Sequence, residues 1–150
     1  GAEAILFTGS FFGAAVRRAR DYVEVPVVTS FDGLVDRALD LDQPLRVLST
    51  TPESARLLVA ELEEEAMRRS SRVTVTSQSV VGAMDALLGG APDRHDDLII
   101  HSVRATEPGS AVLFAQFSME RVLTRSAVVT AAPVIGPASE GTVRLRRLLS

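Results

Sequence analysis

Short apolar runs alternate along the chain with longer segments in which apolar positions recur at helical spacing. An unbroken apolar run such as 4–8 or 111–115 is typical of a strand that is buried on both faces of a sheet. The pattern predicts six strands, at residues 4–8, 26–29, 45–49, 72–76, 111–115 and 127–130.

Caps and breakers predict the helices between these strands. Thr51 suits the N-cap position, and Pro52 suits the first helical position, where the missing N–H costs nothing. Ser30 and Ser118 are candidate N-caps of two further helices, and Gly89-Gly90 is a typical helix end. The predicted helices cover residues 13–20, 31–39, 52–69, 80–88, 92–105, 119–125 and 138–149.

The alternation of strands and helices predicts an α/β fold with parallel sheets flanked by helices. In such sheets, ligands bind at the carboxyl ends of the strands, where helix N-termini offer free N–H groups. Four predicted turns lie at strand ends, at residues 8–10, 49–51, 116–118 and 131–133. Three are rich in small or hydroxyl residues, which suits a small anion such as a carboxylate, although helix capping alone is the commoner explanation of any one turn.

The composition and charge of the chain limit the classes of partner that we expect. A chain of 150 residues with 46% hydrophobic and 23% charged residues is long enough to bury a core. A net charge of −3 gives no electrostatic reason to expect nucleic acid, and we expect the C-terminal trio Arg144, Arg146 and Arg147 to face water. Because no apolar stretch could span a bilayer and no basic segment opens the chain, we expect no membrane partner, no signal peptide and a cytoplasmic location.

Several kinds of chemistry lack the residues they need. The chain has no cysteine, which excludes disulfides, thiolate nucleophiles and cysteine-ligated metals. Its two histidines, His95 and His101, are not spaced as metal ligands, and we expect the His95-Asp96 pair to lie on a solvated helix face rather than to act as a general base. No glycine-rich nucleotide motif or G-x-S-x-G elbow follows any strand. We therefore predict no metal and no cofactor.

Two strand-end segments together resemble a known family. The segment AILFTGS at 4–10, followed by a helix, is similar to the first catalytic-cysteine turn of the aspartate/glutamate/hydantoin racemase superfamily, and VLFAQFSM at 112–119 is similar to its second. Other segments are similar to the family's connecting region, the first strand of its second lobe and its closing segment, namely 25–28 with 31–39, 45–52 and 133–136. The resemblance covers nearly the whole chain, by pattern rather than by a single motif.

The resemblance implies two α/β lobes that face each other across a cleft. Residues 1–40 would then be the end of the N-terminal lobe with its connecting helix, 41–130 the C-terminal lobe, and 131–150 a closing segment with the C-terminal helix. About two strands of the N-terminal lobe would be missing. We expect an N-terminal portion to precede Gly1, because half a sheet would leave apolar edges open; a reduced member of the family is the alternative.

The resemblance also implies a racemase-like site without its thiols. In the family, two cysteines exchange the α-proton of an amino acid, and their positions fall here on Gly9 and Gln116. Glycine has no side chain and an amide is no base near neutral pH, so two-thiol racemisation is not available to this chain. By resemblance, Ser10, Thr50 and Thr51 are expected to hold a substrate carboxylate, and Gln116, with Ser118 beside it, to donate or accept a hydrogen bond to the same ligand. Phe11 and Phe117 would make the cleft wall apolar, which core packing explains equally well.

Three functions are compatible with these residues. The first is a racemase-like protein that binds a small carboxylate-bearing molecule between the lobes, with or without another reaction. The second is a ligand sensor without turnover, and the third is a structural subunit whose cleft is filled by phenylalanine side chains. Family resemblance is also compatible with a homodimer.

Overall fold

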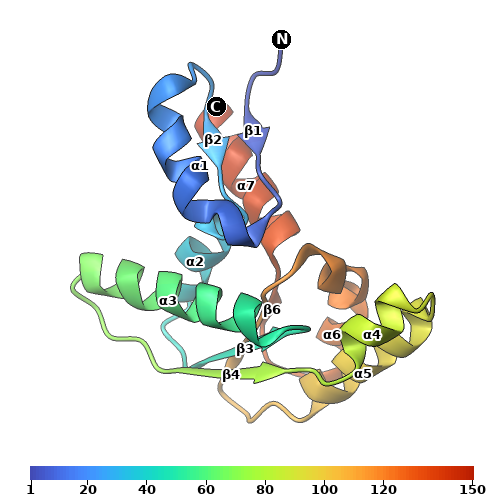
Figure 1. The fold of residues 1–150 in the computed structure, drawn as a ribbon. Helices are drawn as coiled ribbons and strands as arrows, with labels where there is room; N and C mark the ends of the chain where they lie inside the picture. Colours follow the sequence, from blue (N-terminus) through green and yellow to red (C-terminus); the bar gives the residue numbers. More distant parts are fainter.

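The computed structural model describes residues 1–150 as an α/β structure with two parallel sheets (Figure 1). The larger sheet has four strands in the order β4-β3-β5-β6, and in the smaller sheet β1 pairs with β2. The strands are β1 (Ile5–Leu6), β2 (Val27–Val28), β3 (Leu45–Ser49), β4 (Val75–Ser79), β5 (Ala111–Phe114) and β6 (Val134–Ile135). Every pairing is parallel, so the predicted fold class is confirmed.

Helices cover both faces of the larger sheet. The α-helices are α1 (Gly13–Ala19), α2 (Asp32–Leu39), α3 (Pro52–Arg68), α4 (Ala83–Leu88), α5 (Pro92–Arg104), α6 (Leu123–Val129) and α7 (Pro137–Leu149), and the 3-10 helices are η1 (Ser10–Phe12), η2 (Arg20–Tyr22) and η3 (Phe117–Val122). One core cluster joins the sheet to α2 and α3, and a second joins its other face to α4, α5 and η3. Figure 1 shows the smaller sheet lying with α1 and α7 apart from the larger one.

The two central strands, β3 and β5, have both faces buried. Val47 and Leu113 are fully buried in the cluster with α2 and α3, whereas Leu48, Val112 and Phe114 are fully buried in the cluster on the opposite face. Successive side chains of a strand point to opposite faces, so a strand covered on both sides is mostly apolar. This is why the sequence pattern locates β3 and β5 almost to the residue. One exception in β3 is Arg46, which is half-buried and donates to Thr106 and Gln78.

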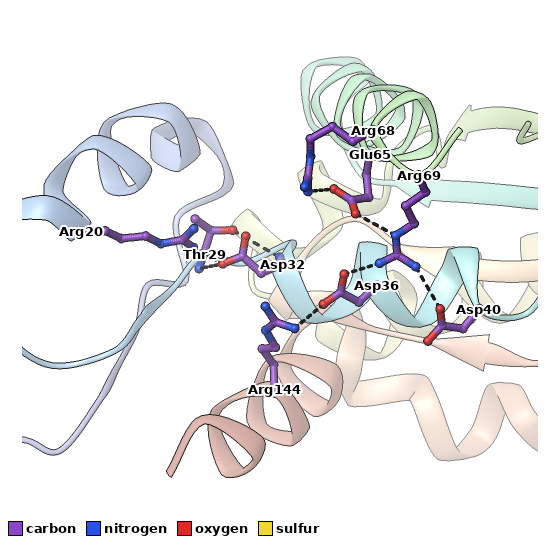
Figure 2. A network of polar contacts seen from close by, with 9 residues as sticks. All are labelled: Arg20, Thr29, Asp32, Asp36, Asp40, Glu65, Arg68, Arg69 and Arg144. Atoms are coloured by element: carbon purple, nitrogen blue, oxygen red, sulfur yellow. Dashed lines mark hydrogen bonds and ion pairs between the residues drawn. The ribbon is translucent and has the colours of Figure 1, made fainter. Parts of the chain in front are cut away.

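A chain of ion pairs joins α7, α2 and α3 (Figure 2). Arg144 Nη1 donates to Asp36 Oδ2 at 2.7 Å, and Asp36 Oδ1 accepts from Arg69 Nη2 at 2.5 Å. Arg69 also donates to Asp40 at 3.0 Å and to Glu65 at 2.7 Å. Arg146 and Arg147 are exposed as expected, whereas the Arg144 side chain is 41% exposed and is paired with Asp36. Each pair is partly solvated and contributes little singly, but together they hold three helices in register.

Two predicted strands are misplaced. The fourth is β4 at Val75–Ser79 rather than 72–76, because it pairs residue for residue with β3 and must end level with it. Residues 127–129 belong to α6, and the sixth strand is β6, which pairs with Val112 and Leu113. The β-branched run at 128–130 favours a strand locally, yet the Val128 side chain is 82% exposed and needs no sheet to cover it.

Of the three predicted N-cap residues, one is confirmed and two are wrong. Thr51 caps α3 as expected, since its Oγ1 accepts from the Ser54 N–H at 3.4 Å. Ser30 and Ser118 cap nothing, because neither α2 nor η3 has a side-chain cap at its N-cap position. At α2, Thr29 and Asp32 bond instead to each other's backbone N–H, at 2.7 and 3.3 Å, in the manner of a capping box (Figure 2).

Candidate functional site

The turn after β3 carries two of the predicted binding residues, Thr50 and Thr51. The Thr51 hydroxyl is occupied locally, because it accepts from the Ser54 N–H and donates to Ser54 Oγ at 3.0 Å. The Thr50 side chain is 7% exposed, and its hydroxyl oxygen is buried without a hydrogen-bond partner. An unpartnered buried hydroxyl costs free energy, and His95 Nε2 and Ser126 Oγ are in the same state elsewhere in the structure. Of these three atoms, Thr50 Oγ1 is the one at a strand end, where it could bond to a ligand.

The turn after β5 lies directly beside it. The parallel register pairs Leu48 with Phe114, so the two strands end at the same edge of the sheet. There the Thr50 N–H donates to Gln116 Oε1 at 2.6 Å. The structure thus joins two predicted site residues from turns that are 66 residues apart, and Phe117 and Ser118 follow Gln116 at the same edge.

The turn after β1 is closed by aromatic rings. Phe7 and Phe12 pack edge to face, with ring centroids 6.0 Å apart and an interplanar angle of 85°. A Cβ atom at Gly9 would lie 2.9 Å from Cε1 of Phe7 and 3.2 Å from Cδ2 of Phe12. Any side chain at position 9, a thiol included, would therefore have to displace these rings. The space in front of Gly9 is thus filled by the rings of Phe7 and Phe12.

Ser10 and Phe11 belong to η1, which packs against α3. Figure 1 shows this turn directed toward α3. The ion pair between Arg17 and Glu61, at 3.0 Å, also holds the segment after η1 to α3. Phe11 is 61% exposed, and no hydrogen bond connects Ser10 or Phe11 with Thr50 or Gln116. The predicted site residues therefore form two groups, one at the edge of the larger sheet and one on η1.

A hollow of about 670 Å³ lies elsewhere, between α1, β2, α2, α3 and α7, and none of the predicted site residues lines it. Its charged side chains are largely paired with one another. Arg20 bonds to Asp32, Arg68 to Glu65, and Arg144 to Asp36, as Figure 2 shows. Because these charges already neutralise each other, size alone does not make the hollow a better ligand site than the strand ends.

η3 is anchored by Glu120, a residue that the sequence did not single out. Its Oε1 accepts from the backbone N–H groups of Ala138 at 2.6 Å and Ser139 at 3.1 Å, at the start of α7. Gly136, the N-cap residue of α7, has no side chain to do this, and a Cβ there would overlap the Glu120 carboxylate. A helix that begins Gly-Pro without a capping side chain of its own is the only signal for such a distant cap.

A second anchor of η3 is the buried Asp96. Its carboxylate accepts from Arg121 Nε at 3.1 Å and lies 2.9 Å from His95 Nδ1. Burial acts to raise the pKa of Asp96, but the hydrogen bonds from Arg121 and His95 outweigh it, and the pKa is lowered. His95 is fully buried and Asp96 is 5% exposed, so the expectation of a solvated helix face is wrong. The pair holds η3 against α5 instead.

Glu140, on α7 close to Glu120, shows the opposite shift. Burial between α7 and α2 raises its pKa, and the charge of Glu120 adds to this, whereas Arg37 and Arg147 oppose it.

No three or more histidine, aspartate or glutamate side chains are grouped as metal ligands would be. None of the helices has the length and apolar composition needed to cross a membrane.

Asp96→Asn removes the charge of this anchor while keeping one acceptor oxygen. Because the pKa of Asp96 is lowered on folding, its ionised form stabilises the fold above the unfolded-state pKa, and that stabilisation is lost as the pH falls through the folded-state value. We expect the variant to lose about 1–3 kcal/mol of unfolding free energy at pH 7 and progressively less below about pH 4, measured by urea denaturation. Asp97→Asn, at a side chain 74% exposed, is the control. An equal loss of unfolding free energy at pH 7 and below about pH 4 would contradict this account.

The fold is similar to that of several solved structures, although no family model and no curated sequence matches the chain. Allantoin racemase from Klebsiella pneumoniae has a TM-score of 0.70 at 14% identity, with 99% of this chain and 60% of that chain covered. A glutamate racemase isoform from Bacillus anthracis has a TM-score of 0.67 at 11% identity, covering 98% and 57%. A double mutant of arylmalonate decarboxylase in its liganded form has a TM-score of 0.59 at 15% identity, covering 99% and 67%.

The chain spans about 60% of the length of the allantoin racemase. Likeness at such low identity shows the fold, and it agrees with the resemblance that the strand-end turns carry in the sequence. The chain therefore has a fold similar to that of the allantoin and glutamate racemases and of arylmalonate decarboxylase.

Proposed function

We propose that this protein binds a small carboxylate-bearing molecule where β3 and β5 end, and that it does so without two-thiol racemisation. The observation that carries the proposal is the pairing of Thr50 with Gln116 at the N-terminus of α3, beside a buried hydroxyl that lacks a partner. Assembly as a homodimer and a cytoplasmic location, both expected from the sequence, stay predictions.

The start of α3 supports an anionic ligand. α3 is 17 residues long and begins immediately after Thr50 and Thr51. At this helix start Pro52 has no N–H and the Ser54 N–H is bonded to Thr51, so the Glu53 N–H is the one left without a partner. The helix dipole also places partial positive charge there, which favours a carboxylate. In this proposal the ligand carboxylate lies against the turn after β3 and gives the Thr50 hydroxyl the partner it lacks.

The chemistry named for the similar structures supports a small carboxylate without requiring racemisation. Glutamate and arylmalonate, named in two of the similar structures, both carry carboxylates, and the second protein is named for decarboxylation. Allantoin, named in another, carries carbonyl oxygens but no carboxylate. The fold therefore serves more than one reaction type. Neither Gly9 nor the Gln116 amide can remove an α-proton, so we assign no proton-transfer step to either residue.

One observation favours a second candidate, a structural subunit with a closed cleft. The rings of Phe7 and Phe12 already occupy the space in front of Gly9, as a filled cleft would require. A binding site and a filled site differ in their response to ligands, which separates these two functions experimentally.

Thermal unfolding in the presence of candidate ligands tests the binding proposal. We expect at least one of the carboxylates succinate, L-glutamate and phenylmalonate to raise Tm in a concentration-dependent way, because a ligand at a hundred times its Kd adds about 2.7 kcal/mol to the unfolding free energy. Succinamide and sodium chloride at matched concentrations are the controls for shape and ionic strength. No shift with any of the three would support the structural subunit instead.

Deuterium exchange at the α-carbon tests the absence of thiol chemistry. In deuterated buffer we expect the α-proton signal of L-glutamate to decay no faster with the protein than without it, since no group at either cysteine-equivalent position is a base near neutral pH. Proton NMR over several hours measures the decay. Exchange that depends on protein concentration would contradict this account and would require a base from elsewhere.

A further inference from the structure

We infer that Gln116 is a fixed hydrogen-bond donor, whose amide N–H groups bind a carboxylate oxygen of the ligand. The inference rests on the proposed function and says how the site recognises its ligand. The position at which the family carries a proton-transferring thiol would here recognise an acceptor.

The first step is the orientation of the amide. A backbone N–H can only donate, so the group that faces the Thr50 N–H at 2.6 Å must be the Gln116 oxygen. Turning the amide by 180° would bring its NH2 group against the Thr50 N–H, placing two donors face to face. The contact therefore decides which way the amide points.

The second step is the state of the amide nitrogen. Gln116 Nε2 makes no hydrogen bond within the chain, and it is not among the buried polar atoms that lack a partner, so solvent or a ligand can reach it. An amide NH2 group offers two donor hydrogens and no acceptor. A ligand atom at this place must consequently be an acceptor, as a carboxylate or carbonyl oxygen is.

The third step is the rigidity of the turn. Gln116 lies at the start of η3, which Glu120 ties to the N-terminus of α7 and Arg121 ties to the buried Asp96. With its oxygen held by Thr50, the side chain loses little further freedom when a ligand binds. A donor oriented in advance binds more strongly than one that must first be ordered.

Gln116→Glu tests the donor directly. A glutamate side chain has the same length and can still accept from the Thr50 N–H, but its second oxygen is an anionic acceptor where the NH2 group was. We expect Kd for succinate and phenylmalonate, measured by calorimetry, to rise about tenfold or more, the range for a lost hydrogen bond to a charged group. Gln43→Glu makes the same charge change before β3, at the opposite edge of the sheet, and should leave Kd unchanged.

Two measurements on the unsubstituted protein do not depend on the variant folding. The Thr50 amide should exchange slowly with deuterium, and the Gln116 side-chain NH2 resonances should shift when succinate or phenylmalonate is added. A fast-exchanging Thr50 amide, or unshifted NH2 resonances at saturating ligand, would overturn the donor role.

Comparing ligand binding by the unsubstituted protein and by Gln116→Glu distinguishes the donor role of Gln116 from the proposed function. If the unsubstituted protein binds a carboxylate and Gln116→Glu binds it equally well or better, the donor role is wrong and the proposed function stands. If the unsubstituted protein binds neither probe nor any other carboxylate, the proposed function fails and the donor role falls with it.

Discussion

The parallel pairing of β3 with β5 is the constraint on which the candidate site depends. The backbone ladder between the strands runs to the bond from Ala115 N–H to the Leu48 carbonyl, at 2.9 Å. One step further along β3, the Thr50 N–H finds no backbone acceptor and bonds to the Gln116 side chain instead. The side-chain amide of Gln116 thus accepts the hydrogen bond that follows the last backbone bond between the two strands. Its orientation follows from the sheet rather than from a loop.

After Gln116, η3 connects the end of β5 to the rest of the molecule. Glu120 supplies the negative charge that the N-terminus of α7 favours, and Arg121 neutralises Asp96 beneath it. Because His95 and Asp96 are buried, their bonds are less screened by solvent than the ion pairs that join α7, α2 and α3 on the surface. The position of Gln116 is therefore determined from three directions: β3, α5 and α7.

The sequence predicts what is local and misses what is distant. The apolar runs of β3 and β5 and the Thr51-Pro52 helix start are local signals, and the structure contains all three. The polar edge strand β4 is found only by its register with β3, and the two-residue β6 is too short to outweigh the β-branched run at 128–130. Glu120 as a cap and His95 as a buried residue depend on partners 18 or more residues away, or on burial that no local pattern reveals.

Gly9 and Gln116, which the sequence resemblance aligns with the family's two cysteines, differ in their surroundings. Aromatic carbon fills the space at Gly9, and an oriented amide occupies position 116. A nitrogen–proton correlation titration with succinate and phenylmalonate tests most directly whether this edge of the sheet binds carboxylates. The account predicts shifts concentrated at the amides of residues 50–54 and 116–118 and at the Gln116 side chain. Shifts confined to the charged hollow around Arg20, Arg68 and Arg144, or no shifts at all, would contradict it.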